Sequence, residues 1–403
     1  MTDPYAGMVV DAHHACQRGT GSYPATLARA LNSHFTADAL AIISQWPGYT
    51  PTPLLALSGM AADAGVGSVL YKHEASRFGL GSFKALGGGY AVFRLLAQRI
   101  EEETGHVPQV ADLLAGCYRD ITRKVTVTCA TDGNHGRSVA WGASLFGCNS
   151  VIFVHGTVTR QRAEEIARLG ARIVRDPGNY DDAVRAANAA GEANGWLVVS
   201  DTSYEGYMTV PLDVMRGYGV LLHETLAQLG NRQPTHVFLQ GGVGGFAAAI
   251  ISGLWEHYGE GCPRIIIVEP ENAACLLLSA RNGRPSVVSG LHDTIMAGLA
   301  CGEPSLVAWP YVEGAVSDYL AIPDEAVRVA IRQLAQGRGQ PPVIAGESGA
   351  AGLAGFLVAA TDAPVRQTLG LDGRSCVLLI GTEGATDVQM WESITGRRLE
   401  QPT

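Results

Sequence analysis

Short runs of β-forming residues alternate with helix-length stretches through the middle and C-terminal parts of the chain, and this alternation constrains the fold more than any other feature. Candidate strands lie at residues 125–129, 150–154, 171–175, 196–199, 235–239, 264–268 and 375–380. Helix-length stretches separate most of them, at 135–146, 160–169, 180–194, 212–229 and 246–258. Strands that alternate with helices form parallel sheets covered by helices. The pattern therefore predicts an α/β fold with ligands at the carboxyl ends of its strands.

The remaining segments are less regular. The sequence predicts helices at 24–34, 37–45, 84–104 and 324–334 and a strand at 68–72, while Pro51 and Pro53 impose an extended conformation between them. Residues 302–323 show no clear period and are expected to form the wall of a pocket. With 403 residues, 47% of them hydrophobic, the chain is long enough for two or three domains.

Charge and hydropathy narrow the classes of partner. The formal net charge is −9 and only 17% of residues are charged, which disfavours nucleic acid, because nucleic-acid binding needs a basic face. The first residues lack the basic and apolar regions of a secretion signal, and no later stretch has 18 uninterrupted apolar residues. We therefore expect a cytoplasmic protein that binds a small molecule and no membrane.

Eight cysteines are scattered without a Cys-x-x-Cys pair, so we expect reduced thiols and no zinc site. The adjacent His13 and His14 lack nearby cysteine or carboxylate partners at ligand spacing, and we expect no bound metal. Cys275 and Cys301 both follow elements that should end near the mouth of the pocket. A redox-sensitive pairing of these two thiols stays open as a hypothesis.

Lys84 stands out among the lysines. It follows a turn that contains Gly79 and Gly81, has Phe78 and Phe83 nearby, and leads into the glycines at 87–89. An amine among apolar neighbours loses hydration of its charged form, which lowers its pKa and makes it a better nucleophile toward an aldehyde. Such a lysine suits Schiff-base chemistry. The alternative is an ordinary surface lysine at the start of a helix.

Two loops follow candidate strands and open helices. Residues 130–136, Ala-Thr-Asp-Gly-Asn-His-Gly, would present free amides to an anion such as a substrate carboxylate, although Asp132 or Asn134 could instead simply cap the helix. Residues 240–246, Gln-Gly-Gly-Val-Gly-Gly-Phe, would let the backbone approach a phosphate, or form only a tight structural turn. The second loop lacks both P-loop and dinucleotide signatures, which favours a single phosphate over a nucleotide.

Together these elements resemble the fold type II family of pyridoxal 5′-phosphate enzymes, the group of threonine dehydratase and the tryptophan synthase β subunit. The matching motifs are Ser82-Phe83-Lys84, Gly133-Asn134-His135-Gly136, the glycine loop 241–245, Thr52-Pro53-Leu54 and the small-residue run 346–351. The resemblance spans nearly the whole chain. It implies two domains, each with a mostly parallel sheet flanked by helices: a large discontinuous one from 1–90 and 210–403, and a small one at 91–209. It also implies a homodimer.

The resemblance assigns roles to individual residues. Lys84 would carry the cofactor and Asn134 would bond its ring hydroxyl. Thr382 would face the ring nitrogen, with the neighbouring Glu383 as a competitor for that role. The loop that would hold the phosphate, here called the glycine cup, consists of Gly241, Gly242, Val243, Gly244 and Gly245. The substrate would contact Thr131, Asp132, Gly133 and Asp201.

Within the family, the chain is similar to diaminopropionate ammonia-lyases, which accept both D- and L-2,3-diaminopropionate. The features that carry this likeness are Asp132, Asp201, and the stretches 296–302 and 381–387. D and L substrates present the Cα proton to opposite faces, so two bases help. By resemblance, Asp201 would deprotonate the L isomer and Asp132 the D isomer, and elimination would yield pyruvate and two ammonia. A carboxylate would also attract the β-ammonium of the substrate.

Three alternatives remain beside that assignment. The chain could be a threonine or serine dehydratase of the same fold, although Asp132 and Asp201 weaken this interpretation. A non-catalytic Rossmann-like ligand-binding protein would explain the glycine loops but not Lys84 or the two acids. For Asp201 alone, an ordinary helix N-cap would be the simpler interpretation without the family resemblance.

Overall fold

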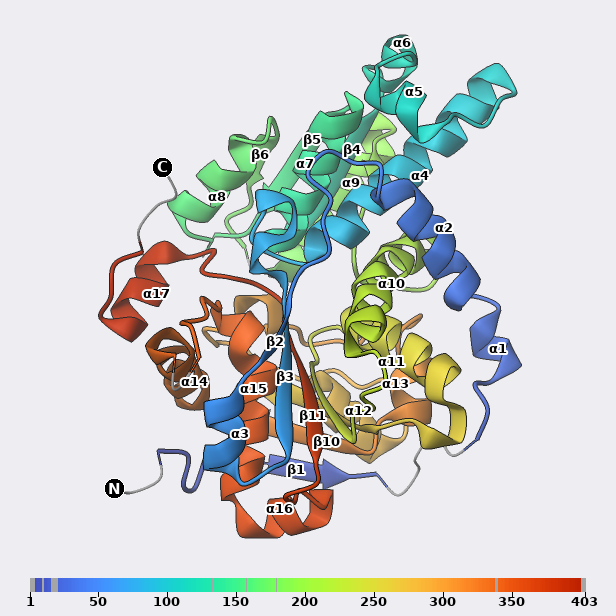
Figure 1. Ribbon diagram of the computed structural model, residues 1–403. Helices are drawn as coiled ribbons and strands as arrows, with labels where there is room; N and C mark the ends of the chain where they lie inside the picture. The colour runs from blue at the N-terminus through green and yellow to red at the C-terminus, as the bar shows by residue number, and fades with distance from the viewer. Residues whose placement is uncertain are drawn as a thin grey trace. The chain divides into compact units, whose positions relative to one another are not determined.

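Two separate β-sheets organise the chain (Figure 1). The computed structural model describes residues 4–8, 11–15, 21–131, 133–156, 158–178, 180–337 and 340–399. These form two units: Met1–Asn32, Pro51–Ser76 and Leu222–Thr403 make the first, and Ser33–Thr50 with Arg77–Leu221 make the second. The predicted α/β class with mostly parallel sheets flanked by helices is confirmed.

The first unit contains a seven-stranded sheet whose central strands are parallel. In spatial order its strands are β1 (Asp11–His14), β10 (Asp318–Ile322), β9 (Arg264–Pro270), β8 (His236–Gln240), β11 (Cys376–Gly381), β3 (Ser68–His73) and β2 (Leu54–Ala56). The edge strands β1 and β2 are antiparallel to their neighbours. Strands β8 and β9 are buried along nearly their whole length. Their continuous apolar runs are typical of parallel strands that are covered on both faces.

Helices cover both faces of this sheet. α15 packs on β8, β9, β10 and β11 and α3 on β3, whereas α11 and α12 contact β8, β9 and β10 (Figure 1). A large apolar core joins the sheet to α3, α14, α15 and α17. The helices of this unit are α1 (Ala25–Ala28), α3 (Ser58–Ala64), α11 (Gly245–Tyr258), α12 (Cys275–Asn282), α13 (Trp309–Ala315), α14 (Asp324–Gln336), α15 (Glu347–Thr361), α16 (Ala363–Leu369) and α17 (Val388–Thr395).

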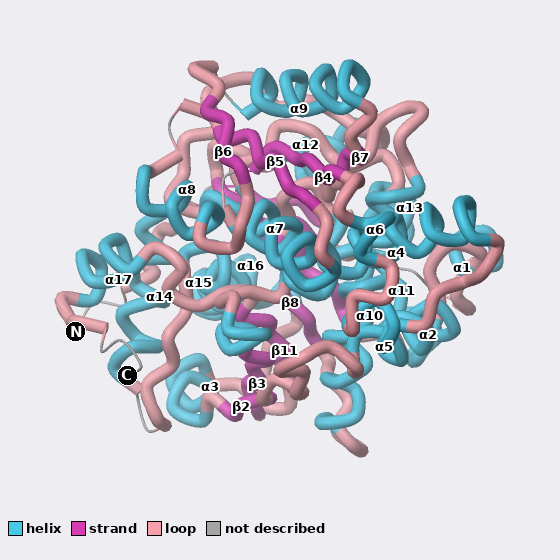
Figure 2. The backbone as a smooth tube through the Cα atoms, turned by 90° about the horizontal axis from the view of Figure 1, so that it is seen from above, coloured by secondary structure: helices cyan, strands magenta, loops and turns pink. Residues whose placement is uncertain are grey.

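The second unit has a four-stranded, fully parallel sheet. Its strands in order are β6 (Arg172–Arg175), β5 (Asn149–Val154), β4 (Thr126–Thr131) and β7 (Leu197–Val198). Figure 2 shows α9 on one side of these strands and α7 on the other. The helices are α2 (Ser33–Ile43), α4 (Lys84–Thr104), α5 (Val110–Leu114), α6 (Arg119–Thr122), α7 (Asn134–Phe146), α8 (Arg160–Ala167), α9 (Tyr180–Asn194) and α10 (Thr209–Leu229), whose last turns enter the first unit.

The glycines at 87–89 lie inside α4 and allow other helices to approach closely. A Cβ at Gly87 would overlap Tyr218 of α10, and one at Gly88 would overlap the Ser138 hydroxyl of α7. A Cβ at Gly142 of α7 would lie 3.0 Å from the Gly89 Cα. The run therefore serves helix packing directly after Lys84.

The second unit is larger than the predicted small domain at 91–209. It consists of residues 33–50 and 77–221, so the whole of α4 lies in it. The reason is the tight packing of α4 against α7 and α10, which joins the residues just after Lys84 to this unit.

Several elements differ from the sequence-based prediction, among them α1, β10 and β1. The helix predicted at 24–34 is shorter, because α1 ends at Ala28, whose carbonyl oxygen accepts from the Asn32 side chain at 2.7 Å. Helix α2 corresponds to the helix predicted at 37–45 but begins earlier, at Ser33. Strand β10 lies in the stretch 302–323 that shows no period. Its charged Asp318 is accommodated by Arg264, which donates two hydrogen bonds of 2.7 and 3.0 Å. Strand β1 pairs with β10 through only four residues.

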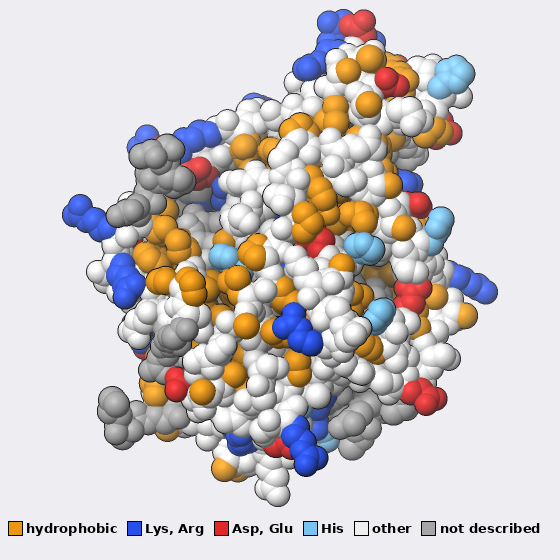
Figure 3. Space-filling model, in the orientation of Figure 1, with side chains coloured by type: hydrophobic (Ala, Val, Ile, Leu, Met, Phe, Trp, Pro, Cys, Tyr) orange, Lys and Arg blue, Asp and Glu red, His pale blue; other side chains and the backbone are white. Residues whose placement is uncertain are grey.

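Among the described helices, none is by itself long and apolar enough to cross a membrane, and α15 with α16, bent by 106°, pass that test only as a pair. On the face shown in Figure 3, lysine and arginine side chains are scattered rather than gathered into one patch.

Candidate active site

Lys84 is the first residue of α4, and the loop in front of it places it there. Phe78, Gly79 and Gly81 all have positive φ, at 51°, 69° and 77°, so the chain turns sharply between the 3₁₀ segment Glu74–Gly79 and the helix. The Lys84 side chain is only 19% exposed. Its ammonium donates a hydrogen bond to Asp201 Oδ2. Lys84 is therefore a largely buried amine that is paired with a carboxylate, and it is not an ordinary surface lysine.

Asp201 lies in the loop after β7, and its side chain is 14% exposed. Burial on its own would raise the pKa of Asp201, but the positive charges of His135 and Lys84, with the hydrogen bond from Lys84, hold that pKa well below its usual range. The following helix, α10, begins only at Thr209. Asp201 is thus an ionised carboxylate beside the lysine and not a helix cap.

His135 supports Asp201 from α7. Its Nε2 donates to the Val199 carbonyl oxygen at 2.7 Å, because that oxygen only accepts, and its Nδ1 lies 3.7 Å from Asp201 Oδ2. The imidazole is buried. The sequence contained His135 in the Gly-Asn-His-Gly motif, but nothing local indicated that it would face Asp201.

The loop between β4 and α7 uses the Thr131 hydroxyl for its own amides. Thr131 Oγ1 accepts from Gly133 N at 3.0 Å and Gly136 N at 3.1 Å. The N-cap residue is Gly133, which makes no side-chain cap hydrogen bond, and Asn134 is the first helical residue. The alternative that Asn134 is the helix cap is therefore wrong, since Thr131 satisfies these amides. Asp132 lies outside the described residues.

The glycine cup of the first unit forms the turn between β8 and α11. Gly242 and Gly244 have φ of 60° and 95°, which side chains disfavour. A Cβ at Gly241 would lie 2.5 Å from Glu269 Cγ. Helix α11 begins at Gly245 after Gly244, which makes no side-chain cap hydrogen bond. A bare backbone loop before a helix N-terminus suits one phosphate group.

Glu269, which the sequence did not single out, lies against the cup. Its carboxyl accepts from Leu276 N at 2.9 Å and Leu277 N at 2.8 Å in the first turn of α12. Complete burial raises the pKa of Glu269 to about 8, against the lowering effect of these amides. The raised pKa reduces the negative charge that Glu269 places beside the glycine cup.

Thr382 and Glu383 follow β11, and both are buried. Glu383 Oε1 accepts from Ser348 N at 2.9 Å, at the start of α15, and its backbone oxygen accepts from Gly346 N at 3.1 Å. The Glu383 carboxylate is thus engaged by α15, which favours Thr382 for the role at the ring nitrogen.

Cys275 and Cys301 are free thiols in the structure. The Cys275 thiol donates to the Gly242 carbonyl oxygen at 3.4 Å, and burial, with the nearby Glu269 and Cys301, raises its pKa. Burial also raises the pKa of Cys129, near Asp201, so this thiol stays protonated. Among the described residues, no three His, Cys, Asp or Glu side chains group as a metal site would require.

A family model described as "Pyridoxal-phosphate dependent enzyme" matches residues 45–380. The chain belongs to the pyridoxal-phosphate dependent enzymes. It is 39% identical to diaminopropionate ammonia-lyase of Escherichia coli (strain K12) over 356 residues, covering 86% of this chain and 87% of that protein. It is 38% identical to diaminopropionate ammonia-lyase of Salmonella typhimurium over 382 residues, covering 90% and 92%.

A crystal structure of the Escherichia coli enzyme in complex with an aminoacrylate–PLP azomethine reaction intermediate superposes with a TM-score of 0.86 at 33% identity, covering 96% of this chain and 97% of that one. The residues of this pyridoxal-phosphate dependent enzyme fit the cofactor. Within the first unit, the glycine cup has positive φ at Gly242 and Gly244, which side chains disfavour, so its backbone stays bare for a phosphate. Within the second unit, the sheltered Lys84 amine suits the aldehyde of the cofactor.

Proposed function

We propose that this pyridoxal-phosphate dependent enzyme is an ammonia-lyase that converts D- and L-2,3-diaminopropionate to pyruvate and two ammonia. The main support for the proposal is the pairing of Lys84 with Asp201, since it places the candidate Schiff-base lysine beside an ionised carboxylate in one sheltered site. Identity of 39% to a diaminopropionate ammonia-lyase over most of the chain supports it.

Pyridoxal phosphate, when bound, supplies an aldehyde for amines and an electron-withdrawing ring that weakens the Cα–H bond of the substrate. Lys84 would contribute the amine that holds the cofactor. The glycine cup would hold the phosphate through backbone amides and the N-terminus of α11. Asn134, the first residue of α7, would bond the ring hydroxyl, and Thr382 would face the ring nitrogen.

Asp201 is suited to accept the Cα proton of the L isomer. With the Lys84 ammonium beside it, the negative charge of the carboxylate is balanced, so the carboxylate is a weak base. When the Lys84 amine is engaged elsewhere, the same carboxylate stays sheltered but loses the lysine charge and the hydrogen bond that lower its pKa. Its basicity therefore rises at the stage at which a proton must be removed.

Asp132 is proposed as the base for the D isomer on the evidence of its place in the sequence, two residues before Asn134. Two carboxylates would also favour a substrate with a β-ammonium over one with a β-hydroxyl, because the ammonium leaving group carries a positive charge. This distinction separates the lyase from a serine or threonine dehydratase of the same fold.

We further propose that the enzyme is a cytoplasmic homodimer. The described cysteines are free thiols, as is usual in a reducing compartment. The homodimer rests on the resemblance to fold type II enzymes. Light scattering coupled to size-exclusion chromatography tests it, and a mass of about one chain, near 42.4 kDa, would contradict it.

The deciding experiment measures pyruvate release by cofactor-loaded enzyme from D- and L-2,3-diaminopropionate, with L-serine and L-threonine alongside. We expect rapid turnover of both diaminopropionate isomers. Loss of a general base costs roughly 10²–10⁴-fold, so Asp201→Asn should lower L turnover by that factor and Asp132→Asn should do the same for D turnover. Turnover of serine or threonine but of neither diaminopropionate isomer would make the protein a dehydratase.

A further inference from the structure

The loop that carries Asp201 is held by side chains instead of by a long strand. Strand β7 has only two residues, Leu197 and Val198, and it pairs with β4. The last backbone bond to β4 is that of Val199 N to the Thr128 carbonyl oxygen, at 2.8 Å. Side chains serve as the partners of the Val198 and Val199 carbonyl oxygens and of Ser200 N.

Tyr207 supplies two of those partners with one hydroxyl group. Its oxygen donates to the Val198 carbonyl oxygen at 2.8 Å and accepts from Ser200 N at 3.0 Å. Burial raises the pKa of Tyr207, so the hydroxyl keeps its proton and stays a donor. Together with His135, which donates to the Val199 carbonyl oxygen, the hydroxyl engages the backbone from Val198 to Ser200.

A tight turn returns Tyr207 to the strand that it holds. Tyr204 and Tyr207 bond each other through their backbones, with Tyr207 N at 2.9 Å from the Tyr204 oxygen, and Gly206 between them has φ of 85°. The two tyrosine rings stack at 5.0 Å with an interplanar angle of 17°. Tyr204 is exposed, and its hydroxyl lies outside the Val198–Ser200 bridge.

We propose that Tyr207 is a positioning residue for Asp201, whose hydroxyl bridge fixes the carboxylate where it accepts the Cα proton. This inference rests on the proposed function, because it concerns the base of that reaction. A displacement of about 1 Å costs an enzyme roughly 10²-fold. Loss of the bridge should therefore act on the step that Asp201 performs, through kcat.

Tyr207→Phe keeps the ring and its stacking but removes both hydrogen bonds, and Tyr204→Phe is the matched control in the same turn. On cofactor-loaded enzyme we expect Tyr207→Phe to lower kcat on the L isomer by about 10–100-fold and to leave KM and D turnover within about threefold of the wild type. Tyr204→Phe should leave both isomers unchanged. Hydrogen exchange of residues 197–203 in the cofactor-free protein should speed up in Tyr207→Phe only.

The double variant Tyr207→Phe/Asp201→Asn separates positioning from general support of the fold. If Tyr207 acts through Asp201, the double variant is no slower than Asp201→Asn alone. Losses that multiply, or unchanged activity and exchange in Tyr207→Phe, would overturn the inference. If Asp201→Asn lowers the turnover of both isomers equally, the two-base assignment fails. The positioning role of Tyr207 then requires that Tyr207→Phe also lower the turnover of the two isomers by equal factors.

Discussion

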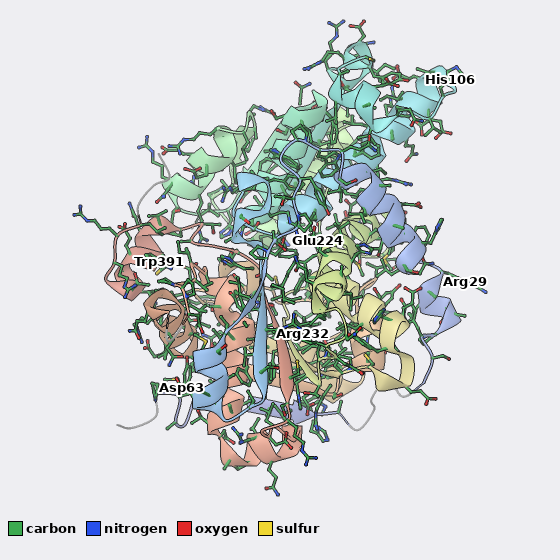
Figure 4. The ribbon with its side chains drawn as sticks, in the orientation of Figure 1. Arg29, Asp63, His106, Glu224, Arg232 and Trp391 are labelled. Carbon is green, nitrogen blue, oxygen red and sulfur yellow. The ribbon has the colours of Figure 1, made fainter. Side chains whose placement is uncertain are left out.

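A buried ion pair in the first unit offers a quantitative test of what holds that unit together. Lys72 of β3 is fully buried and donates to Glu224 Oε2 at 2.9 Å, to the Thr52 carbonyl oxygen at 2.7 Å and to Gln228 Oε1 at 3.2 Å. Glu224, labelled in Figure 4 near the end of β3, is 2% exposed and also accepts from Thr52 N at 3.2 Å. The Thr52-Pro53-Leu54 motif thus closes a buried charge network.

Removing one partner should cost far more than removing both. Lys72→Met leaves the Glu224 carboxylate buried without its counter-charge, and Glu224→Leu leaves the Lys72 ammonium in the same position. Each change is expected to lower the free energy of unfolding by about 3–5 kcal/mol. The double variant replaces both charges by apolar groups, so its loss should be only about 1–3 kcal/mol, the cost of the Thr52 and Gln228 hydrogen bonds that remain unmade.

Urea unfolding followed by far-UV circular dichroism measures these free energies. Arg160→Met is the control, because the Arg160–Glu164 pair is also short, at 2.7 Å, but its side chains are 92% and 49% exposed. That change should cost less than about 1 kcal/mol. Single-variant losses as small as the control, or a double variant that loses the sum of the two singles, would refute the reasoning.

Three further predictions concern buried groups near the site. Among the described residues no hydrogen-bond partner faces the buried Tyr218 hydroxyl, so Tyr218→Phe should raise the free energy of unfolding in urea by about 1–2 kcal/mol; a loss would reveal a partner. The pKa of Glu269 is raised from an ordinary 4.5 to about 8, so its contribution to stability is complete below about pH 4.5 and is lost as pH rises through about 8. Between those pH values, the urea midpoint should therefore fall less in Glu269→Gln than in the wild type, and parallel curves would contradict this. Gly241→Ala should weaken pyridoxal phosphate binding at least about tenfold, measured by fluorescence titration, because its Cβ would lie 2.5 Å from Glu269 Cγ; unchanged affinity would show that the cup adjusts.

The parallel core strands could be predicted from the sequence because their burial leaves a local signature. Strands β8, β9 and β11 are near-continuous apolar runs, and each was predicted to within two residues at either end. Strand β10 was missed because it begins with Asp318 and has only a short apolar run, Tyr319–Ile322. The partners that make this charge tolerable, Arg264 and His14, come from two other strands.

The features of the site also fall into those that the local sequence predicts and those that depend on tertiary contacts. The sequence by itself determined the lysine after a glycine turn and the glycine cup after a strand, because φ preferences and the lack of side chains act within a few residues. Only the tertiary structure decided that Lys84 meets Asp201, 117 residues away, and that Glu383 is engaged by α15. It also placed His135 and Tyr207 at the loop that carries Asp201. The charge state of a carboxylate depends on its burial and on charges brought to it by folding, and those are properties that no short stretch of sequence contains.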